Sequence, residues 1–297
     1  MLDIIFNPIS NTGKSKKAYD YVIKTLDAKG IEYKTHPTQK SNHATEIVRE
    51  LNKQPKTDLI VLGGDGTFNE VLNGIDNFET ITLGFIPCGT GNDYVKAAGI
   101  PMDFSKSLDI ILNNYSDYTD FIQLDDRRSL NCAGAGMDAD VLVRFNTMKF
   151  WKGKIKYYMS LLDVLLHLKF HKVEITLDGK TEEKSVFLIS VANGTCIGGG
   201  MPISPNSIIN DGKFDVVIVN EIKPGKVLPL LLKFLKGKHI NEPCTETYRT
   251  DEVIIKILDD GKPQVDGEVF DNKVLNCKLI TKTLKIFCNE SVKPELE

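Results

Sequence analysis

The sequence lacks the best-known phosphate-binding fingerprints and any paired cysteine motif. No G-x-x-x-x-G-K-[ST] pattern is present, which excludes a Walker loop. No G-x-G-x-x-G opens a helix after the first expected strand, which excludes a dinucleotide-binding fingerprint. The six cysteines are scattered without a C-x-x-C pair, which argues against a zinc site and a disulfide framework. We therefore expect a cytoplasmic location.

Long apolar runs and an excess of positive charge are also missing. No apolar stretch approaches the roughly 20 residues that a transmembrane helix needs. The chain opens with an expected short strand rather than a signal peptide. A net charge of -3 gives no reason to expect nucleic-acid binding. Membrane contact is therefore expected to be peripheral, and the sequence leaves a homodimer open.

The 297 residues are enough for two domains. Residues 1–122 alternate expected strands with expected helices. The strands are expected at 3–7, 31–36, 58–62 and 81–86, and the helices at 14–28, at 43–52 and from 67. This rhythm predicts an α/β domain with a Rossmann-like open parallel sheet, whose ligands bind at the carboxyl ends of its strands.

Residues 123–282 carry short alternating segments separated by turns such as Asp178-Gly179. They predict an antiparallel β-sandwich, interrupted by two helical insertions at 153–170 and 226–235. Separate strands are expected at 274–280 and 283–288. The sequence leaves open whether the tail 283–297 packs back on the first domain.

The most informative motif follows the apolar run Leu59 to Leu62 and reads Gly63-Gly64-Asp65-Gly66-Thr67-Phe68-Asn69-Glu70. A strand, a glycine turn and a helix start present backbone N–H groups to an anion. We expect the glycines to adopt positive φ and to let a phosphate approach the backbone. A carboxylate beside phosphates indicates a divalent cation, so Asp65 suggests Mg²⁺. The alternative is an ordinary strand-to-helix turn.

Three further loops end at the same edge of the predicted sheet. Asn7-Pro8-Ile9-Ser10-Asn11-Thr12-Gly13-Lys14 follows the first strand, and its small polar residues and lysine suit phosphates. Thr38 follows the second strand. Pro87-Cys88-Gly89-Thr90-Gly91-Asn92-Asp93 follows the fourth, with Thr90 as a donor and Asp93 at a helix start. A simple N-cap is the alternative role for Asp93.

Two Asp-Gly turns stand out in the second domain. They are Asn210-Asp211-Gly212-Lys213-Phe214 and Val265-Asp266-Gly267-Glu268. Either one also fits a plain hairpin turn, because Asp-Gly is a strong hairpin signal.

Taken in order, these motifs resemble the bacterial soluble diacylglycerol kinase family, which is related to sphingosine kinases and NAD kinases. The resemblance implies a lipid kinase that binds ATP between its domains and uses Mg²⁺. It implies Glu268 as the general base and a structural Mg²⁺ held by the carbonyls of Ile208 and Lys213 and the carboxylate of Asp211. Asp65 and Asp93 suit the catalytic Mg²⁺. The implied ATP contacts are Asn7, Pro8, Ile9, Ser10, Asn11, Thr38, Gly63, Gly64, Asp65, Gly66, Thr67, Asn69, Glu70 and Thr90.

Two rival functions remain open at this point. One is a kinase of a soluble alcohol, similar to an NAD kinase, although the D-G-E glutamate speaks against it. The other is a nucleotide-binding regulatory protein without catalysis, against which the presence of Glu268, Asp65 and Asp211 argues.

Two basic segments of the second domain indicate a partner. Residues 144–172 carry seven basic residues against Asp163 alone, and residues 221–239 carry five lysines against Glu221. Aromatic residues and leucines lie among the charges, which suits an anionic membrane surface. The alternative is a pair of amphipathic helices packed on the sandwich with solvated lysines. We expect the membrane surface to be the partner that delivers a lipid substrate.

Overall fold

The computed structural model describes residues 1–8 and 13–290, apart from the side chains of residues 153 and 154. It divides into two compact units. Unit 1 comprises Met1–Phe121, Ile209–Gly212 and the chain from Ile280 onward, and unit 2 comprises Ile122–Ile208 and Lys213–Leu279.

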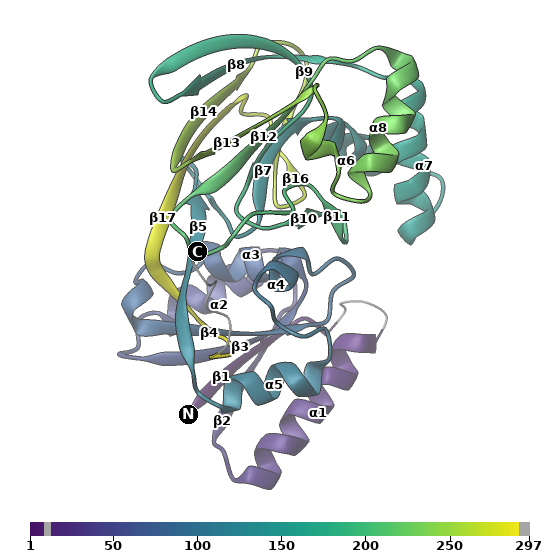
Figure 1. Cartoon of the computed structure of the whole chain (residues 1–297). Helices are drawn as coiled ribbons and strands as arrows, with labels where there is room; N and C mark the ends of the chain where they lie inside the picture. Colours follow the sequence, from purple (N-terminus) through teal and green to yellow (C-terminus); the bar gives the residue numbers. More distant parts are fainter. Residues whose placement is uncertain (9–12, 291–297) are drawn as a thin grey trace. The chain divides into compact units, whose positions relative to one another are not determined.

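Unit 1 contains a parallel sheet in the order β2-β1-β3-β4 (Figure 1). Leu59 to Leu62 of β3 are fully buried, as expected for a strand covered on both faces. Helices α1 and α5 pack together in one core cluster on this sheet, while α2 contacts α3. The strands are β1 (Leu2–Phe6), β2 (Tyr33–Pro37), β3 (Thr57–Gly63) and β4 (Ile81–Pro87); the α-helices are α1 (Lys14–Lys29), α2 (His43–Leu51), α3 (Asp65–Asn73), α4 (Asp93–Ala97) and α5 (Phe104–Leu112).

Unit 2 is built of antiparallel strands in the order β16-β15-β7-β9-β8-β14-β17, with β12 pairing both β9 and β13. The predicted fold class, an open parallel sheet followed by an antiparallel sandwich, is thereby confirmed. The main strands of unit 2 are β6 (Arg128–Ser129), β7 (Cys132–Gly136), β8 (His171–Leu177), β9 (Lys180–Ala192), β12 (Phe214–Asn220), β13 (Thr245–Thr250), β14 (Glu252–Ile257), β15 (Pro263–Val265) and β16 (Glu268–Val269). Strand β5 (Ser116–Gln123) belongs mostly to unit 1, and β17 (Val274–Phe287) begins in unit 2 and ends in unit 1.

The structure corrects two expected boundaries. Strand β17 is continuous, whereas two strands were expected over the same residues, and its end pairs with β4 through Lys285 and Ile286. Helix α3 begins at Asp65 rather than at residue 67. Asp65 therefore belongs to the first helical turn and not to the preceding loop.

Three helices belong to unit 2: α6 (Met137–Thr147), α7 (Gly153–Leu166) and α8 (Val227–Phe234). The positions of α7 and α8 match the two expected insertions, but α6 was not expected. Its buried residues Met137, Ala139 and Val141 recur every second position, which is the spacing of a strand. No helix in the described part of the chain is long and apolar enough to cross a bilayer.

Candidate functional site

The two predicted glycine loops meet where β3 and β4 end. The N–H groups of Cys88 and Gly89 donate to the carbonyl oxygen of Gly63, at 2.7 and 3.1 Å. A Cβ placed on Gly64 would lie 2.8 Å from Cα of Gly89, and one on Gly89 would lie 2.5 Å from Cα of Gly64. No side chain fits at either position, so this loop contact requires glycine.

The expectation of positive φ in these glycines is wrong. Gly64 has φ -117, and none of the other glycines in the two loops adopts the left-handed region. Asn92 takes the left-handed conformation instead, with φ 51, and its Nδ2 donates to the carbonyl of Gly89 at 3.0 Å. The glycines are needed for space between the loops rather than for conformational freedom.

Asp65 joins the starts of two helices. Its Oδ1 accepts the N–H of Asp93 at 2.7 Å and that of Tyr94 at 3.4 Å, so the first residue of α3 caps α4. Burial, followed by the nearby charge of Asp93, raises the pKa of Asp65 to about 6. Asp93 itself pairs with Lys96 at 2.9 Å. The structure therefore brings Asp65 to the start of α4 beside Asp93, and the binding of one cation by these two residues stays a prediction.

Sequence reasoning left Asn92 out of the predicted site. Its side chain is fully buried beside Gly89, and its Oδ1 has no hydrogen-bond partner among the described residues. A buried amide oxygen in that state marks a position of functional interest. The sequence signal was its place before the helix-starting Asp93.

The remaining predicted phosphate contacts of α3 differ in their surroundings. Gly66 is exposed, and a Cβ placed on it would meet no atom outside its own helix within 4 Å, so its backbone faces open space. Thr67 packs against Gly63, and Asn69 accepts from Nδ2 of Asn73 at 3.0 Å. Glu70 accepts the N–H of Ala44 at 3.1 Å and so also caps α2. Phosphate binding by these residues stays a prediction.

The other predicted ATP contacts lie at the ends of β1, β2 and β4. The backbone carbonyl of Asn7 accepts a hydrogen bond from the hydroxyl of Ser15 at 2.7 Å, and the N–H of Thr38 donates to the backbone carbonyl of Phe6 at 2.9 Å. Pro8 is exposed, and Thr90 is exposed as well. The predicted contacts Ile9, Ser10 and Asn11 lie outside the described residues.

A carboxylate that sequence reasoning missed lies at the Asp211 turn. Asp120 of β5 is buried and accepts the N–H of Gly212 at 2.9 Å. Burial first, and then the charge of Asp211, raises the pKa of Asp120 to about 6. Ile208 and Lys213 flank this turn in the chain as the nearest residues of unit 2. Two neighbouring acids of this kind suit a divalent cation.

Glu268, the predicted base, lies in unit 2 at the start of β16 and is exposed. The preceding Asp266 and Gly267 have φ 47 and 86 and form the tight turn between β15 and β16. The carboxylate of Asp266 accepts the hydroxyl of Ser129 at 2.6 Å and the N–H of Cys132 at 2.9 Å. The predicted hairpin turn and the predicted base therefore occur in one motif.

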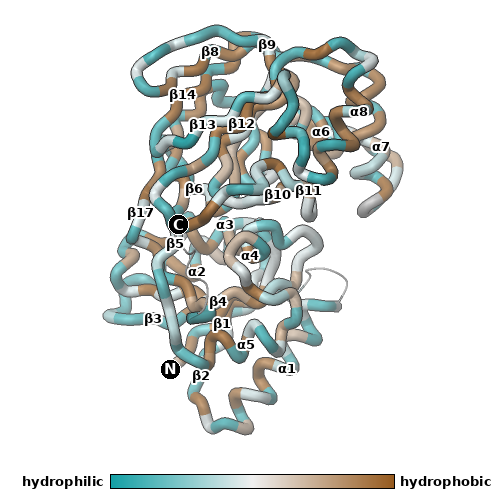
Figure 2. Tube along the Cα trace, in the orientation of Figure 1, coloured by the Kyte–Doolittle hydropathy of each residue, from teal (hydrophilic) through white to brown (hydrophobic). Residues whose placement is uncertain are grey.

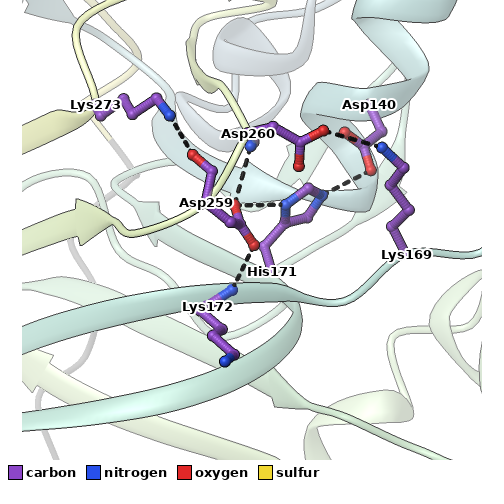
Figure 3. Close-up of polar contacts among 8 residues, drawn as sticks. Asp140, Lys169, His171, Lys172, Asp259, Asp260 and Lys273 are labelled. Carbon is purple, nitrogen blue, oxygen red and sulfur yellow. Dashed lines mark hydrogen bonds and ion pairs between the residues drawn. The ribbon is translucent and has the colours of Figure 1, made fainter.

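A histidine cluster in unit 2 was not anticipated (Figure 3). His171 is buried, and its Nε2 and Nδ1 lie 2.9 Å from Asp140 and 3.1 Å from Asp259. Only a protonated ring donates to two carboxylates, and these partners raise the pKa of His171 to about 9. His171, Asp259 and Asp260 offer metal-ligand atoms within 4.8 Å of one another. Because both ring nitrogens face carboxylates, we infer that the ring is protonated and that the group works as an ion-pair clamp between α6, β8 and the residues after β14.

The comparisons with known proteins agree with this architecture. The diacylglycerol kinase catalytic domain model matches residues 2–124, and the YegS C-terminal NAD kinase beta sandwich-like domain model matches residues 131–288. A protein named diacylglycerol kinase from Bacillus subtilis (strain 168) is 32% identical over 271 residues, which cover 89% of this chain and 88% of the relative. The chain belongs to the bacterial diacylglycerol kinase family.

Other members of the diacylglycerol kinase family extend the match along the whole chain. The relative from Staphylococcus carnosus (strain TM300) is 27% identical and covers 98% of this chain and 95% of its own length. A crystal structure of a diacylglycerol kinase from Bacillus anthracis superposes with a TM-score of 0.74 at 22% identity, covering 98% of both chains, and supports the fold. Membership in this family makes the chain a kinase, with the glycine loops inside the matched catalytic domain.

We predict different outcomes for alanine at two glycines of the first loop. Gly64→Ala should lower stability by about 1–3 kcal/mol, because its methyl group would overlap Gly89. Gly66→Ala should not lower the melting temperature, because its surroundings are open and alanine favours a helix, yet it should weaken ATP binding, because the methyl group would occupy the expected approach of a phosphate. Thermal unfolding and calorimetric titration with ATP measure both effects. Unchanged ATP affinity in Gly66→Ala would refute the phosphate contact.

The His171 clamp predicts a pH dependence of stability. Because the folded-state pKa is raised from 6.5 to about 9, the stabilisation is fully present below pH 6.5 and is lost as pH rises through 9. The loss should reach roughly 3 kcal/mol, from about 1.4 kcal/mol for each pH unit of that window. Denaturant unfolding of the wild type and of His171→Gln at pH 6, 8 and 10 tests this. Parallel stability profiles for the two proteins would contradict the clamp.

Proposed function

We propose that this kinase transfers the γ-phosphoryl group of ATP to the free hydroxyl of a diacylglycerol or a related lipid, with the help of Mg²⁺. The observation that carries the proposal is the contact of two glycine loops where β3 and β4 end, with Asp65 at the first turn of α3. Backbone N–H groups at a helix start suit phosphates. The curated relatives are named diacylglycerol kinase, which supports a lipid acceptor.

The acidic residues present fit Mg²⁺. Burial and a neighbouring carboxylate raise the pKa of both Asp65 and Asp120, and a divalent cation would relieve both effects. Asp65 and Asp93 would hold a catalytic ion, and Asp211 with the carbonyls of Ile208 and Lys213 would hold a structural one. When bound, the catalytic ion supplies positive charge to the phosphate oxygens.

Glu268 would accept the proton of the lipid hydroxyl. Its carboxylate is exposed, and Gly267 before it carries no side chain that would block an acceptor. We predict that Glu268→Gln lowers kcat by about 10²–10⁴-fold while ATP still binds. The assay follows ATP turnover with diacylglycerols in mixed micelles and with soluble alcohols, and Glu183→Gln, an exposed glutamate of β9, serves as control.

Two results would contradict the proposal. Near-normal turnover by Glu268→Gln would remove the base role. Turnover with soluble alcohols alone would favour the rival function, a kinase similar to NAD kinases.

The surface of α7 and α8 supports delivery of the lipid from a membrane. Each helix packs apolar residues into a shared core cluster of unit 2, and other apolar residues of the same helix are exposed. Figure 2 colours both helices by the hydropathy of their residues. On α7 the exposed residues recur at helical spacing, and α8 repeats the pattern. They are Ile155, Tyr158, Leu162 and Leu166 on α7, and Leu228, Leu232 and Leu235 on α8 or directly after it.

The segment before α7 adds aromatic residues and charge. Phe150 and Trp151 are 79% and 56% exposed, and Lys149 and Lys152 on either side of them are exposed too. Solvated amphipathic helices would present polar residues here, so these outward leucines favour an anionic bilayer over the alternative. Peripheral association of a cytoplasmic enzyme is accordingly part of the proposal.

We predict that Lys149→Glu with Lys152→Glu, or Leu162→Gln with Leu166→Gln, weakens sedimentation with anionic vesicles. Each lysine near the surface should contribute about 1 kcal/mol at low salt and less as salt screens it. Activity on bilayer lipid should fall with binding, while activity on a short-chain soluble lipid should survive. Leu258→Gln, at an exposed leucine after β14, is the control. Equal losses on both substrates, or no loss on either, would contradict a membrane face.

A further inference from the structure

The side chain of Gln264 connects the turn before Glu268 to helix α6. Gln264 lies in β15 and is 3% exposed. Its Oε1 accepts the N–H of Gly267 at 3.0 Å, and its Nε2 donates to Oδ2 of Asp138 at 3.0 Å. A backbone N–H only donates and an ionised carboxylate only accepts, so these two partners determine which way the amide points.

Asp138 occupies a costly position for a carboxylate. It lies in the first turn of α6, and burial, followed by weaker repulsion from Asp140, raises its pKa to about 6. Its Oδ1 is buried without a hydrogen-bond partner among the described residues. Burying a carboxylate oxygen in this way opposes folding. If the contact between Asp138 and Gln264 served stability alone, apolar side chains could replace both residues with little loss of folding free energy. The contact therefore points to a role other than stability.

The turn itself is held from two sides. The carboxylate of Asp266 binds the loop before β7 through Ser129, Leu130, Asn131 and Cys132. On the other side Gln264 binds the N–H of Gly267, the residue that directly precedes Glu268. Asp266 anchors the hairpin to the loop before β7, whereas Gln264 fixes the backbone of Gly267, the residue directly before Glu268.

We propose that Asp138 and Gln264 form a positioning pair that orients the Glu268 carboxylate toward the acceptor hydroxyl. The proposal rests on the base role of Glu268 given above. Neither residue is required to touch the lipid or ATP; the pair acts through the direction of the Gly267–Glu268 peptide. A displacement of about 1 Å at a reacting group can cost 10²-fold in rate, so the pair controls turnover rather than ATP affinity.

The test exchanges the hydrogen-bond donor and acceptor between Gln264 and Asp138. Gln264→Glu keeps an acceptor for Gly267 but places two carboxylates against each other. We expect kcat to fall about 10²-fold with an unchanged KM for ATP. Asp138→Asn alone should cost only a few-fold, because its amide oxygen can still face Gln264. The double variant Asp138→Asn with Gln264→Glu restores a donor opposite an acceptor and should recover at least 10-fold of the loss.

Gln264→Met serves as a second variant, because Gln264→Glu can fail to fold. Methionine has a similar length but leaves the N–H of Gly267 without its acceptor, and kcat should again fall with ATP KM unchanged. Gln123→Met is the matched control, since Gln123 also ties a turn through its Nε2, which donates to the carbonyl of Arg127 at 3.1 Å. This control should keep its kcat.

The decisive measurement repeats Gln264→Met in the Glu268→Gln background by single-turnover kinetics. If Gln264 acts through Glu268, the second change adds no further loss. Three results would overturn the positioning role. The first is that the losses in rate from Gln264→Met and Glu268→Gln multiply when the two changes are combined. The others are a folded Gln264→Met with kcat within 3-fold of wild type, and a double variant Asp138→Asn with Gln264→Glu that recovers no activity. Failure of the base role is distinguishable, because Glu268→Gln would then retain turnover by itself.

Discussion

The contact between Gly64 and Gly89 is the constraint on which the candidate phosphate site depends. Parallel pairing of β3 and β4 brings Gly63 opposite Pro87, so the two loops leave the sheet side by side. Their backbones can touch only because neither residue has a side chain. This contact sets the distance between the first turns of α3 and α4, and the bond from Asp65 to the N–H of Asp93 then joins them.

Aspartates with a raised pKa recur where function is proposed, whereas the buried His171 belongs to a structural cluster. Asp65, Asp120 and Asp138 each have a pKa raised to about 6, mainly by burial. Such groups oppose folding and tend to be kept for chemistry. In the His171 cluster the charges compensate one another, because a protonated ring lies between two carboxylates. That cluster holds α6 to β8, and α6 also carries Asp138, so a structural clamp and the proposed positioning pair share one helix.

In the helices of unit 2, buried apolar residues form the core, whereas exposed apolar residues indicate a surface that another apolar phase covers. Met137 and Val141 of α6 are buried in the same core cluster as parts of α7 and α8. On α7 and α8 the opposite faces remain apolar and exposed, which costs solubility unless another apolar phase covers them. Lysines near these leucines suit an anionic surface, and side chains of this kind reach the headgroups while their stems stay apolar.

The sequence by itself determined the fold class, the glycine loops and the order of the motifs. Local patterns are enough for these, since strand periodicity and Gly-Asp-Gly signals act over a few residues. Tertiary structure decided the rest. Gly64 needs space against Gly89, Glu70 caps α2, and Asp120, Asn92 and Gln264 gain their roles from partners that only the fold brings to them. The sequence does not predict helix α6, because its buried residues recur at every second position, as in a strand. Packing against the sandwich overrides that local pattern.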